Sequence, residues 1–311
     1  MNSNPNTYKS NGKLLLTGEY AVLDGAKALA LPTKYGQSLT VEPNDSNLII
    51  WKSLNDLGET WFKDEFHIKN SAAGLHVTAK INNEISKRLV QIFKAARELN
   101  PQFLDTQTGF DVLTRQDFNR NWGLGTSSTL INNVANWAKV DAYKLLQKTF
   151  GGSGYDIACA QNDSPITFQL DNLGEPIIST VAFNPTFKNQ LYFVYLNQKQ
   201  NSRDGIKAYK KLGNINQRFV GQINALTEAL VGCKSLSEFN SLIEKHEKLI
   251  SELIKTAPIK TQLFSDFDGA VKSLGAWGGD FVLVSSEKDP KLYFSEKGFQ
   301  TVIPYEAMVL I

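Results

Sequence analysis

Near its middle the chain reads Trp122-Gly123-Leu124-Gly125-Thr126-Ser127-Ser128, and a helical pattern follows at once. Small residues let backbone N–H groups converge on an anion, and a helix start adds unpaired donors and a positive dipole end. The hydroxyls of Thr126, Ser127 and Ser128 could bind a phosphate oxygen or Mg2+. A turn in which Ser or Thr caps the helix is the simpler explanation. The segment therefore indicates a phosphate site only if other parts of the sequence point to the same chemistry.

The composition is that of an ordinary globular protein. The chain has 311 residues, of which 42% are hydrophobic and 21% are charged, and this length suggests about two domains. The 33 Lys and Arg against 31 Asp and Glu give a net charge of only +2, which argues against nucleic acid as a partner. The two cysteines, Cys159 and Cys233, cannot form a disulfide framework or a multi-cysteine zinc site.

No segment approaches the roughly 18 consecutive apolar residues of a membrane span. The polar start shows no charged region followed by an apolar one, so we expect no secretion. We therefore expect a cytoplasmic protein without a membrane partner.

Helical and strand-like patterns alternate along both halves of the chain. Apolar spacing predicts helices over 81–100 and 127–148, and a mostly helical region over 203–255. Short β-prone runs predict strands at 38–42, 47–51, 110–114, 166–170, 177–183, 191–196, 281–285, 292–294 and 301–304. The fold class is therefore mixed α and β, with a domain boundary expected near 170–190.

Two further glycine clusters stand out. In Gly151-Gly-Ser-Gly-Tyr-Asp156, the acid could act as a general base beside a flexible loop, although it could equally cap the next helical segment. Gly275-Ala-Trp-Gly-Gly-Asp280 precedes a buried-looking strand, and a plain turn with Trp277 in the core would also explain it. His246 lies on an amphipathic helical surface, where we expect a boundary residue and not a metal ligand.

Other common signatures are absent. No Gly-x-x-x-x-Gly-Lys-Ser/Thr loop occurs, and the segment around Ser153 misses the nucleophile-elbow pattern by one residue. The three histidines, His67, His76 and His246, have no metal-ligand spacing.

Taken in order, the glycine segments resemble the motifs of the GHMP kinases, the family of galactokinase, homoserine kinase, mevalonate kinase and phosphomevalonate kinase. The first motif of the family resembles residues 12–25, Gly12-Lys-Leu-Leu-Leu-Thr-Gly-Glu-Tyr-Ala-Val-Leu-Asp-Gly25. Its second and third motifs resemble residues 123–128 and 275–280. Within the family, Glu19-Tyr20-Ala-Val and Gly152-Ser-Gly-Tyr-Asp-Ile-Ala most resemble the phosphomevalonate kinases. Mevalonate kinases carry a related loop, so both remain open.

The resemblance implies an α+β fold of two domains. Residues 1–180 would form an ATP-binding domain like domain 2 of ribosomal protein S5, and 181–311 a ferredoxin-like domain. The active site would lie between them.

The resemblance also implies phosphoryl transfer from ATP, with Mg2+, to a small acceptor. Asp156 would take the acceptor proton, and Lys13 would neutralise charge nearby and keep Asp156 ionised. The nucleotide would bind Gly123, Leu124, Gly125, Thr126, Ser127, Ser128 and Glu19, with Ser127 on the metal. The acceptor would lie near Ser153, Gly154, Gly275 and Ala276, and Lys199 and Arg203 are candidates for binding an anionic group on it.

The acceptor implied is mevalonate or 5-phosphomevalonate, in isoprenoid precursor synthesis. Two positions depart from the family pattern: Asn119 stands where the second motif usually has Pro, and Trp277 replaces a glycine, where a large indole could narrow the loop. Two alternatives follow, a catalytically impaired binding or regulatory protein of this fold and a kinase for a different acceptor such as a sugar or homoserine. The sequence does not indicate an oligomeric state.

Overall fold

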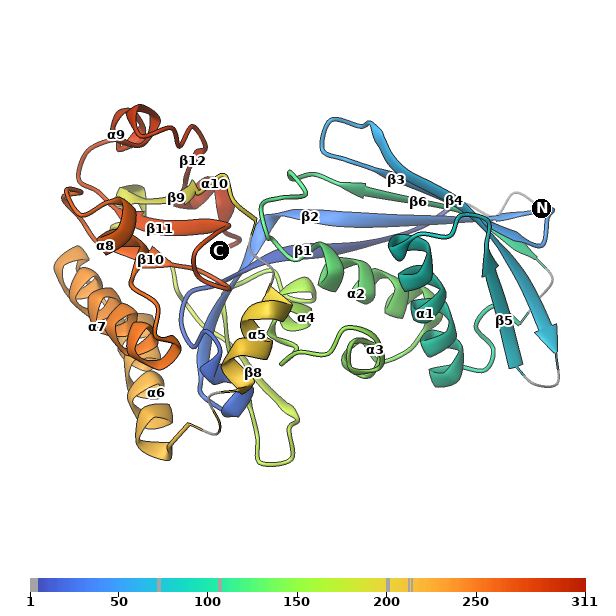
Figure 1. The fold of residues 1–311 in the computed structure, drawn as a ribbon, viewed down its shortest axis with the longest axis horizontal. Helices are drawn as coiled ribbons and strands as arrows, with labels where there is room; N and C mark the ends of the chain where they lie inside the picture. Colours follow the sequence, from blue (N-terminus) through green and yellow to red (C-terminus); the bar gives the residue numbers. More distant parts are fainter. Residues whose placement is uncertain (1–4, 72–73, 106–107, 200–201, 212, 214) are drawn as a thin grey trace. The chain divides into compact units, whose positions relative to one another are not determined.

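The computed structural model describes residues 5–71, 74–105, 108–199, 202–211, 213 and 215–311 (Figure 1). The chain forms two compact units built from interleaved segments. The first unit comprises Met1–Gly12, Tyr35–Arg120 and Gly125–Gln161, and the second comprises Lys13–Lys34, Asn121–Leu124 and Asn162–Ile311. The domain boundary predicted between residues 180 and 181 stays a prediction.

The described residues of the first unit form a mixed sheet and four helices. Strands run in the order β5-β4-β3-β6-β2, with β1 also paired to β2; β3 and β6 are parallel, whereas β3–β4, β4–β5 and β2–β6 are antiparallel. The elements are β1 (Asn6–Leu15), β2 (Ala28–Asn44), β3 (Leu48–Leu54), β4 (Thr60–Ser71), β5 (Gly74–Ala79), α1 (Glu84–Leu99), β6 (Gly109–Gln116), α2 (Thr126–Ala138), α3 (Ala142–Thr149) and α4 (Tyr155–Ala160). Of β1 and β2, only residues 6–12 and 35–44 belong to this unit, and the rest belong to the second.

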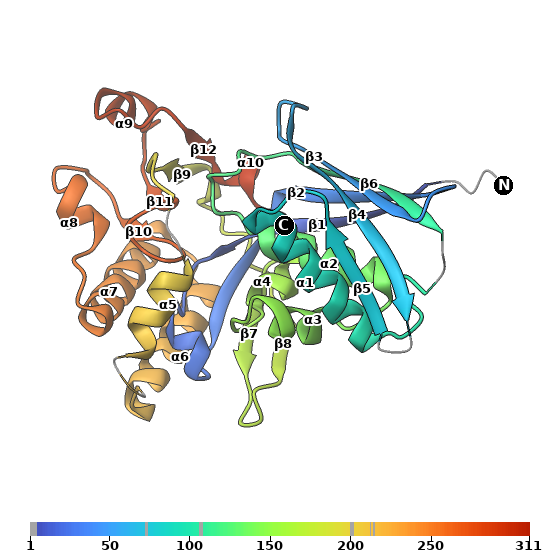
Figure 2. The same cartoon turned by 45° about the vertical axis from the view of Figure 1, so that its right-hand side comes forward.

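The second unit contains a hairpin and a small antiparallel sheet. The hairpin β7–β8 pairs with Ala28–Ala30 at the start of β2, and the small sheet has the order β10-β11-β9-β12. Helices α6 and α7 lie side by side, and α7 packs against β10 (Figure 2). The elements are η1 (Ala21–Asp24), β7 (Ile166–Leu170), β8 (Pro176–Thr180), η2 (Lys188–Gln190), β9 (Leu191–Tyr195), α5 (Ser202–Lys210), α6 (Gln217–Gly232), α7 (Leu236–Ile254), α8 (Ile259–Leu263), β10 (Val271–Ser273), β11 (Phe281–Ser285), α9 (Lys291–Glu296), β12 (Val302–Pro304) and α10 (Tyr305–Met308).

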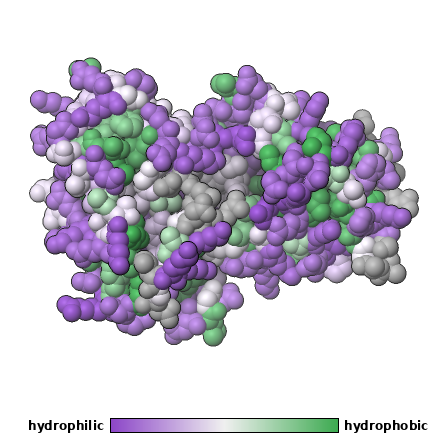
Figure 3. Space-filling view, viewed as in Figure 1, coloured by the Kyte–Doolittle hydropathy of each residue, from purple (hydrophilic) through white to green (hydrophobic). Residues whose placement is uncertain are grey.

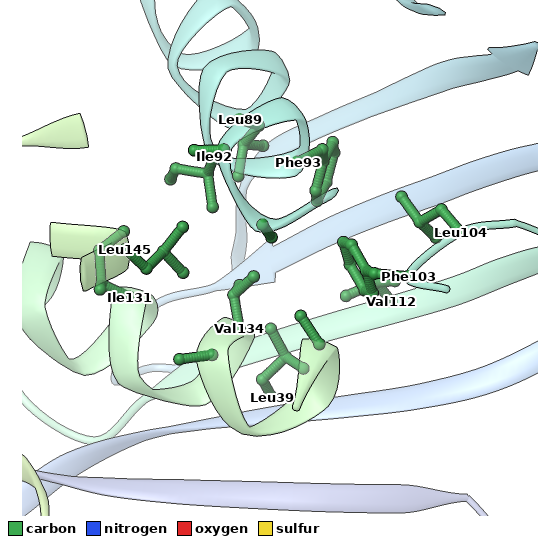
Figure 4. Packing of buried hydrophobic residues seen from close by; sticks show 14 of the residues in the cluster. Leu39, Leu89, Ile92, Phe93, Phe103, Leu104, Val112, Ile131, Val134 and Leu145 are labelled. Carbon is green, nitrogen blue, oxygen red and sulfur yellow. The ribbon is translucent and has the colours of Figure 1, made fainter. Parts of the chain in front are cut away.

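The core of the first unit forms where the apolar stripe of α1 meets the sheet. In β3, Ile49 and Trp51 are buried whereas Ile50 between them is exposed, as period-two alternation requires. Figure 4 shows Leu89, Ile92 and Phe93 of α1 facing side chains from the strands and from α2 and α3. The predicted mixed α and β class is confirmed.

The predicted helix over 127–148 is in fact two helices. Lys139 takes a left-handed conformation with φ +53° and ends α2, and Asp141 then accepts the N–H of Lys144 at 2.9 Å and starts α3. Apolar spacing alone does not register such a break, because both helices keep their apolar faces on the same core.

The predicted strand over 292–294 is wrong, since these residues belong to helix α9. Asp289 accepts the N–H of Lys291 at 2.9 Å, so a turn begins directly before the segment. Phe294 is buried against Phe264 and Phe267, whereas Leu292 is exposed, so a single helical face carries the packing.

The surface is mostly polar on the face that Figure 3 shows, with small hydrophobic areas between hydrophilic side chains. Among the residues that the structure describes, no helix combines the length and the hydropathy that crossing a membrane requires.

Phe93 gives a test of the first core. Its ring lies 5.5 Å from that of Phe66 and 5.8 Å from that of Trp51, and the side chain is fully buried. We expect Phe93→Ala to lower the free energy of unfolding by about 3–5 kcal/mol in urea titrations, because it removes buried surface and leaves a cavity. The exposed neighbour Lys94, changed to Ala, should shift it by no more than about 0.5 kcal/mol. Equal losses in both variants would contradict this packing.

Candidate functional site

Two helices of the first unit begin at a glycine, and both carry predicted site residues. Gly125 (φ +97°) precedes α2 and Gly154 (φ +93°) precedes α4, so no side chain caps either helix. By contrast, α1, α3, α6 and α7 begin at a residue whose side chain accepts a helix N–H. These cap residues are Asn83, Asp141, Asn216 and Ser235. The first N–H groups of α2 therefore lack the side-chain cap that α1, α3, α6 and α7 have.

The three predicted hydroxyls at the start of α2 differ in what they can reach. Ser128 is buried and donates to the carbonyl of Gly125 at 2.9 Å, and Thr126 accepts from Gln116 at 2.8 Å. Ser127 is exposed. Of this trio, Ser127 is therefore the hydroxyl placed to meet a ligand, whereas Ser128 shapes the loop.

A buried polar network fixes α2 and connects it to α4. Asn132 donates to Ser10 of β1 at 2.9 Å and accepts from Gln161, directly after α4, at 2.9 Å. Asn133 accepts from Ser10 at 2.8 Å and donates to the carbonyl of Gln37 at 3.0 Å. Buried hydrogen bonds with strict geometry define one arrangement of the elements that they join. The start of α2 and the helix that carries Asp156 are thus held in one arrangement.

Asp156 lies in the first turn of α4 and is half-buried. It is not the cap residue, since Gly154 takes that position, and its carboxylate accepts the N–H of Ile157 at 3.1 Å. A Cβ at Gly154 would come within 2.9 Å of the Tyr143 ring, so the close approach as well as the positive φ requires glycine. Ser153 is buried in the same loop.

Lys13, at the end of β1, supports the glycine loop within the second unit. Its ammonium donates to the carbonyl of Gly123 at 2.7 Å, and its backbone N–H donates to the carbonyl of Leu124 at 2.9 Å. Gly123 has φ +67°, and a Cβ there would lie 2.3 Å from the carboxylate of Asp280. The last residue of the third motif therefore lies against the first glycine of the second motif.

The third motif forms a turn whose large side chain points inward. Trp277 has φ +55° and is only 3% exposed, packed in a hydrophobic cluster with Ala21, Ala26 and Ile250 among others. The predicted core position of Trp277 is therefore confirmed, and its indole packs in this cluster. Ala276 uses its carbonyl to accept the Tyr20 hydroxyl at 2.8 Å, and Gly275 has φ +58°.

Glu19 is fully buried, and its carboxylate pairs with Lys272 of β10. Burial raises the pKa of Glu19 to about 7, although Lys272 acts in the opposite direction. The boundary position expected for His246 is wrong: the side chain is completely buried, and its Nε2 accepts the N–H of Gly18 at 3.1 Å. Burial and then Lys272 lower the pKa of His246 well below its ordinary value, so the ring stays neutral.

The remaining predicted residues lie on or near the segment after β9. Lys199 is exposed, and Arg203 belongs to α5, but its side chain lies outside the described residues. Within the described ranges, no group of three or more His, Cys, Asp and Glu side chains could hold a metal ion.

Sequence reasoning missed Lys272 and the hydroxyl contact of Tyr20. Lys272 stands in an apolar run directly before the third motif, and that position was the available signal. Its two carboxylate partners come from distant parts of the sequence, which no local pattern reveals.

The approach of Gly123 to Asp280 predicts a measurable coupling. Gly123→Ala adds left-handed strain of about 1–2 kcal/mol and a contact with the Asp280 carboxylate, so it should lower the free energy of unfolding by more than the strain alone. Gly58→Ala is the matched control, because Gly58 has φ +78° and a Cβ added there would meet nothing within 4 Å. In an Asp280→Ala background, the loss from Gly123→Ala should fall to that of Gly58→Ala. Additive losses in a urea-based double-mutant cycle would contradict the contact.

Glu19 predicts a pH dependence of stability. Its carboxyl faces Lys272 from β10 and Glu247 and His246 from α7. Because its pKa rises from 4.5 to about 7 on folding, the folded state binds the proton more tightly. The resulting stabilisation is complete below pH 4.5 and is lost as the pH rises to about 7.

The free energy of unfolding of the wild type minus that of Glu19→Gln should therefore fall between pH 4.5 and 7. The exposed Glu252 of α7, changed to Gln, controls for loss of a carboxylate. A difference that stays level or rises over this interval contradicts the assignment.

Solved structures share this architecture. Streptococcus pneumoniae phosphomevalonate kinase, solved with phosphomevalonate and AMPPNP, is 18% identical with a TM-score of 0.68, over 96% of this chain and 99% of that one. Mevalonate kinase from Methanococcus jannaschii is 16% identical with a TM-score of 0.67, over 100% of both chains. Lactococcus lactis galactokinase, solved with galactose, is 11% identical with a TM-score of 0.62, over 95% of this chain and 89% of that one.

The sequence itself matches no protein-family profile and no curated protein. The likeness is therefore one of fold, and it agrees with the order of the three glycine motifs. The chain has the fold of the GHMP kinases.

Proposed function

We propose that the protein is an ATP-dependent phosphotransferase for a small molecule. The observation that carries this proposal is the start of α2, where a glycine cap leaves backbone N–H groups without a side-chain acceptor and Ser127 is exposed beside them. Such a helix start favours bound phosphate.

The proposed roles belong to Asp156, Lys13 and Ser127. Asp156 accepts the proton of the acceptor hydroxyl while that oxygen bonds to the γ-phosphorus and the bond to ADP breaks. Lys13 supplies positive charge at the Gly123 carbonyl, and Ser127 holds Mg2+ together with the phosphates. The ion would neutralise phosphate charge. The Lys13–Asp156 partnership remains part of the proposal.

The acceptor that we propose is mevalonate or 5-phosphomevalonate, in the cytoplasm. Support comes from the Gly152-Ser-Gly-Tyr-Asp156 sequence and from the fold neighbours named for these compounds. Ser153, Gly154, Gly275 and Ala276 would lie near the acceptor, and Lys199 and Arg203 are the cations proposed for an anionic group.

A second candidate keeps the chemistry and changes the acceptor, and the fold shared with a galactokinase favours it. A non-catalytic binding protein has less support, because the buried position of Trp277 removes one reason for an impaired loop.

The test is Asp156→Asn with Mg-ATP and a panel of mevalonate, 5-phosphomevalonate, galactose and homoserine. If Asp156 is the base, kcat for the accepted compound should fall roughly 100- to 10,000-fold, measured as ADP release. The exposed Asp45, changed to Asn, is the control and should keep wild-type turnover. Wild-type turnover in Asp156→Asn contradicts the base assignment, and no ADP release from the wild type with any acceptor contradicts the proposed substrates.

A further inference from the structure

Four ionisable side chains are buried together in the second unit. Glu19 follows β1, His246 and Glu247 lie on α7, and Lys272 lies on β10. Glu19, His246 and Lys272 are completely buried, and Glu247 is 4% exposed. The catalytic roles proposed above use none of these four side chains, and each buried charge has lost its hydration.

Lys272 is the centre of this cluster. Its ammonium donates to Glu19 and to the carbonyl of Ser273, and it lies 3.1 Å from Glu247. The Ser273 hydroxyl donates to the other oxygen of Glu247 at 2.7 Å. Burial opposes its charge, but the two carboxylates raise the pKa of Lys272, so the ammonium is charged and joins β10 to two other segments.

The cluster is imperfectly satisfied, which argues against a purely stabilising role. Within the described part of this cluster, Glu19 Oε2, His246 Nδ1 and Glu247 Oε1 make no hydrogen bond, although Glu247 Oε1 lies 3.1 Å from the Lys272 ammonium as an ion pair. A buried network with unmet polar atoms is generally less stable than an apolar core of the same volume. A role in positioning neighbouring segments, in place of a contribution to stability, would explain why these charges are buried.

The partners of Lys272 lie next to two glycine motifs. Glu19 stands between Gly18, whose N–H binds His246, and Tyr20, whose hydroxyl binds Ala276. Burial raises the pKa of Tyr20 to about 12, so its hydroxyl stays a donor. The turn 18–20 therefore contacts the third-motif region twice, at Lys272 before the loop and at Ala276 within it.

The far end of the same loop reaches the second motif. Asp280 lies against Gly123, whose carbonyl binds Lys13. The loop 274–280 thus runs between two fixed points, the charged cluster at its start and the Gly123 contact at its end. The position of its first residues, Gly275 and Ala276, depends on the first of these points.

We propose that Lys272 is a positioning residue, which through its ion pairs with Glu19 and Glu247 fixes the loop 274–280 against the turn 18–20 and so sets where the acceptor binds. Only the part of this proposal that concerns acceptor binding rests on the proposed kinase function. A cluster that merely stabilises the second unit is the competing explanation.

A charge-neutral cluster separates these two explanations. Lys272→Met should lower the midpoint of thermal unfolding, because it leaves two carboxylates buried without a cation. Adding Glu19→Gln and Glu247→Gln removes those charges and should restore the midpoint. The control is Lys260→Met, which removes a lysine that donates to the Gly269 carbonyl, outside the loop.

Positioning predicts that the triple variant, though stable, keeps a KM for the acceptor at least tenfold above that of the wild type. Its backbone amides at 275–280 should also exchange with solvent deuterium at least tenfold faster, with exchange in β9 and β11 unchanged. If stability and KM recover together, or if the amides exchange as in the wild type, the proposal is overturned.

Hydrogen exchange needs no substrate, so it tests the positioning even if the wild type phosphorylates none of the acceptors. Failure of turnover in the wild type would contradict the proposed function alone. Unchanged exchange in the triple variant would contradict the positioning role alone.

Discussion

A helix that starts at glycine has no side-chain oxygen to satisfy its first N–H groups, and this constraint organises the candidate site. Gly125 and Gly154 both reach the left-handed region that their turns require, and each places a predicted site residue in the first turn of a helix. The network around Asn132 then holds these two helices together. The two glycine-capped helix starts are therefore placed on a rigid support, which a ligand site needs.

The second unit uses a different means to hold its glycine loops. Side chains and backbone hydrogen bonds together fix the third motif. Lys272 precedes it, Trp277 packs its middle into the core, and Asp280 lies against Gly123 while its backbone pairs with Leu196 and Gln198. These contacts hold Trp277 and Asp280 at their positive φ values, which an unsupported loop would not keep.

The sequence predicted the fold and the strands correctly where the signal lies in neighbouring residues. The three glycine motifs indicated the fold, and short alternating runs located most strands, because both signals come from neighbouring residues. The break at Lys139 and the helix at 291–296 were missed, since each depends on one residue conformation or one buried ring. Lys272 could not be predicted as buried and paired, because Glu19 lies 253 residues away from it. The site roles of Asp156 and Lys13 still come from the resemblance, and the acceptor stays a proposal.

The interleaving of the two units has a consequence for synthesis on the ribosome. All segments of the first unit have been made once Gln161 has emerged, whereas the segment Lys13–Lys34 belongs to a unit that continues to Ile311. Domains generally begin to fold as their chain emerges from the ribosome. The first unit can therefore fold before Lys272, the partner of Glu19, has been synthesised. During that interval the acid has no buried cation to pair with. We therefore expect the nascent chain to keep this segment hydrated until the last third of the protein has been translated.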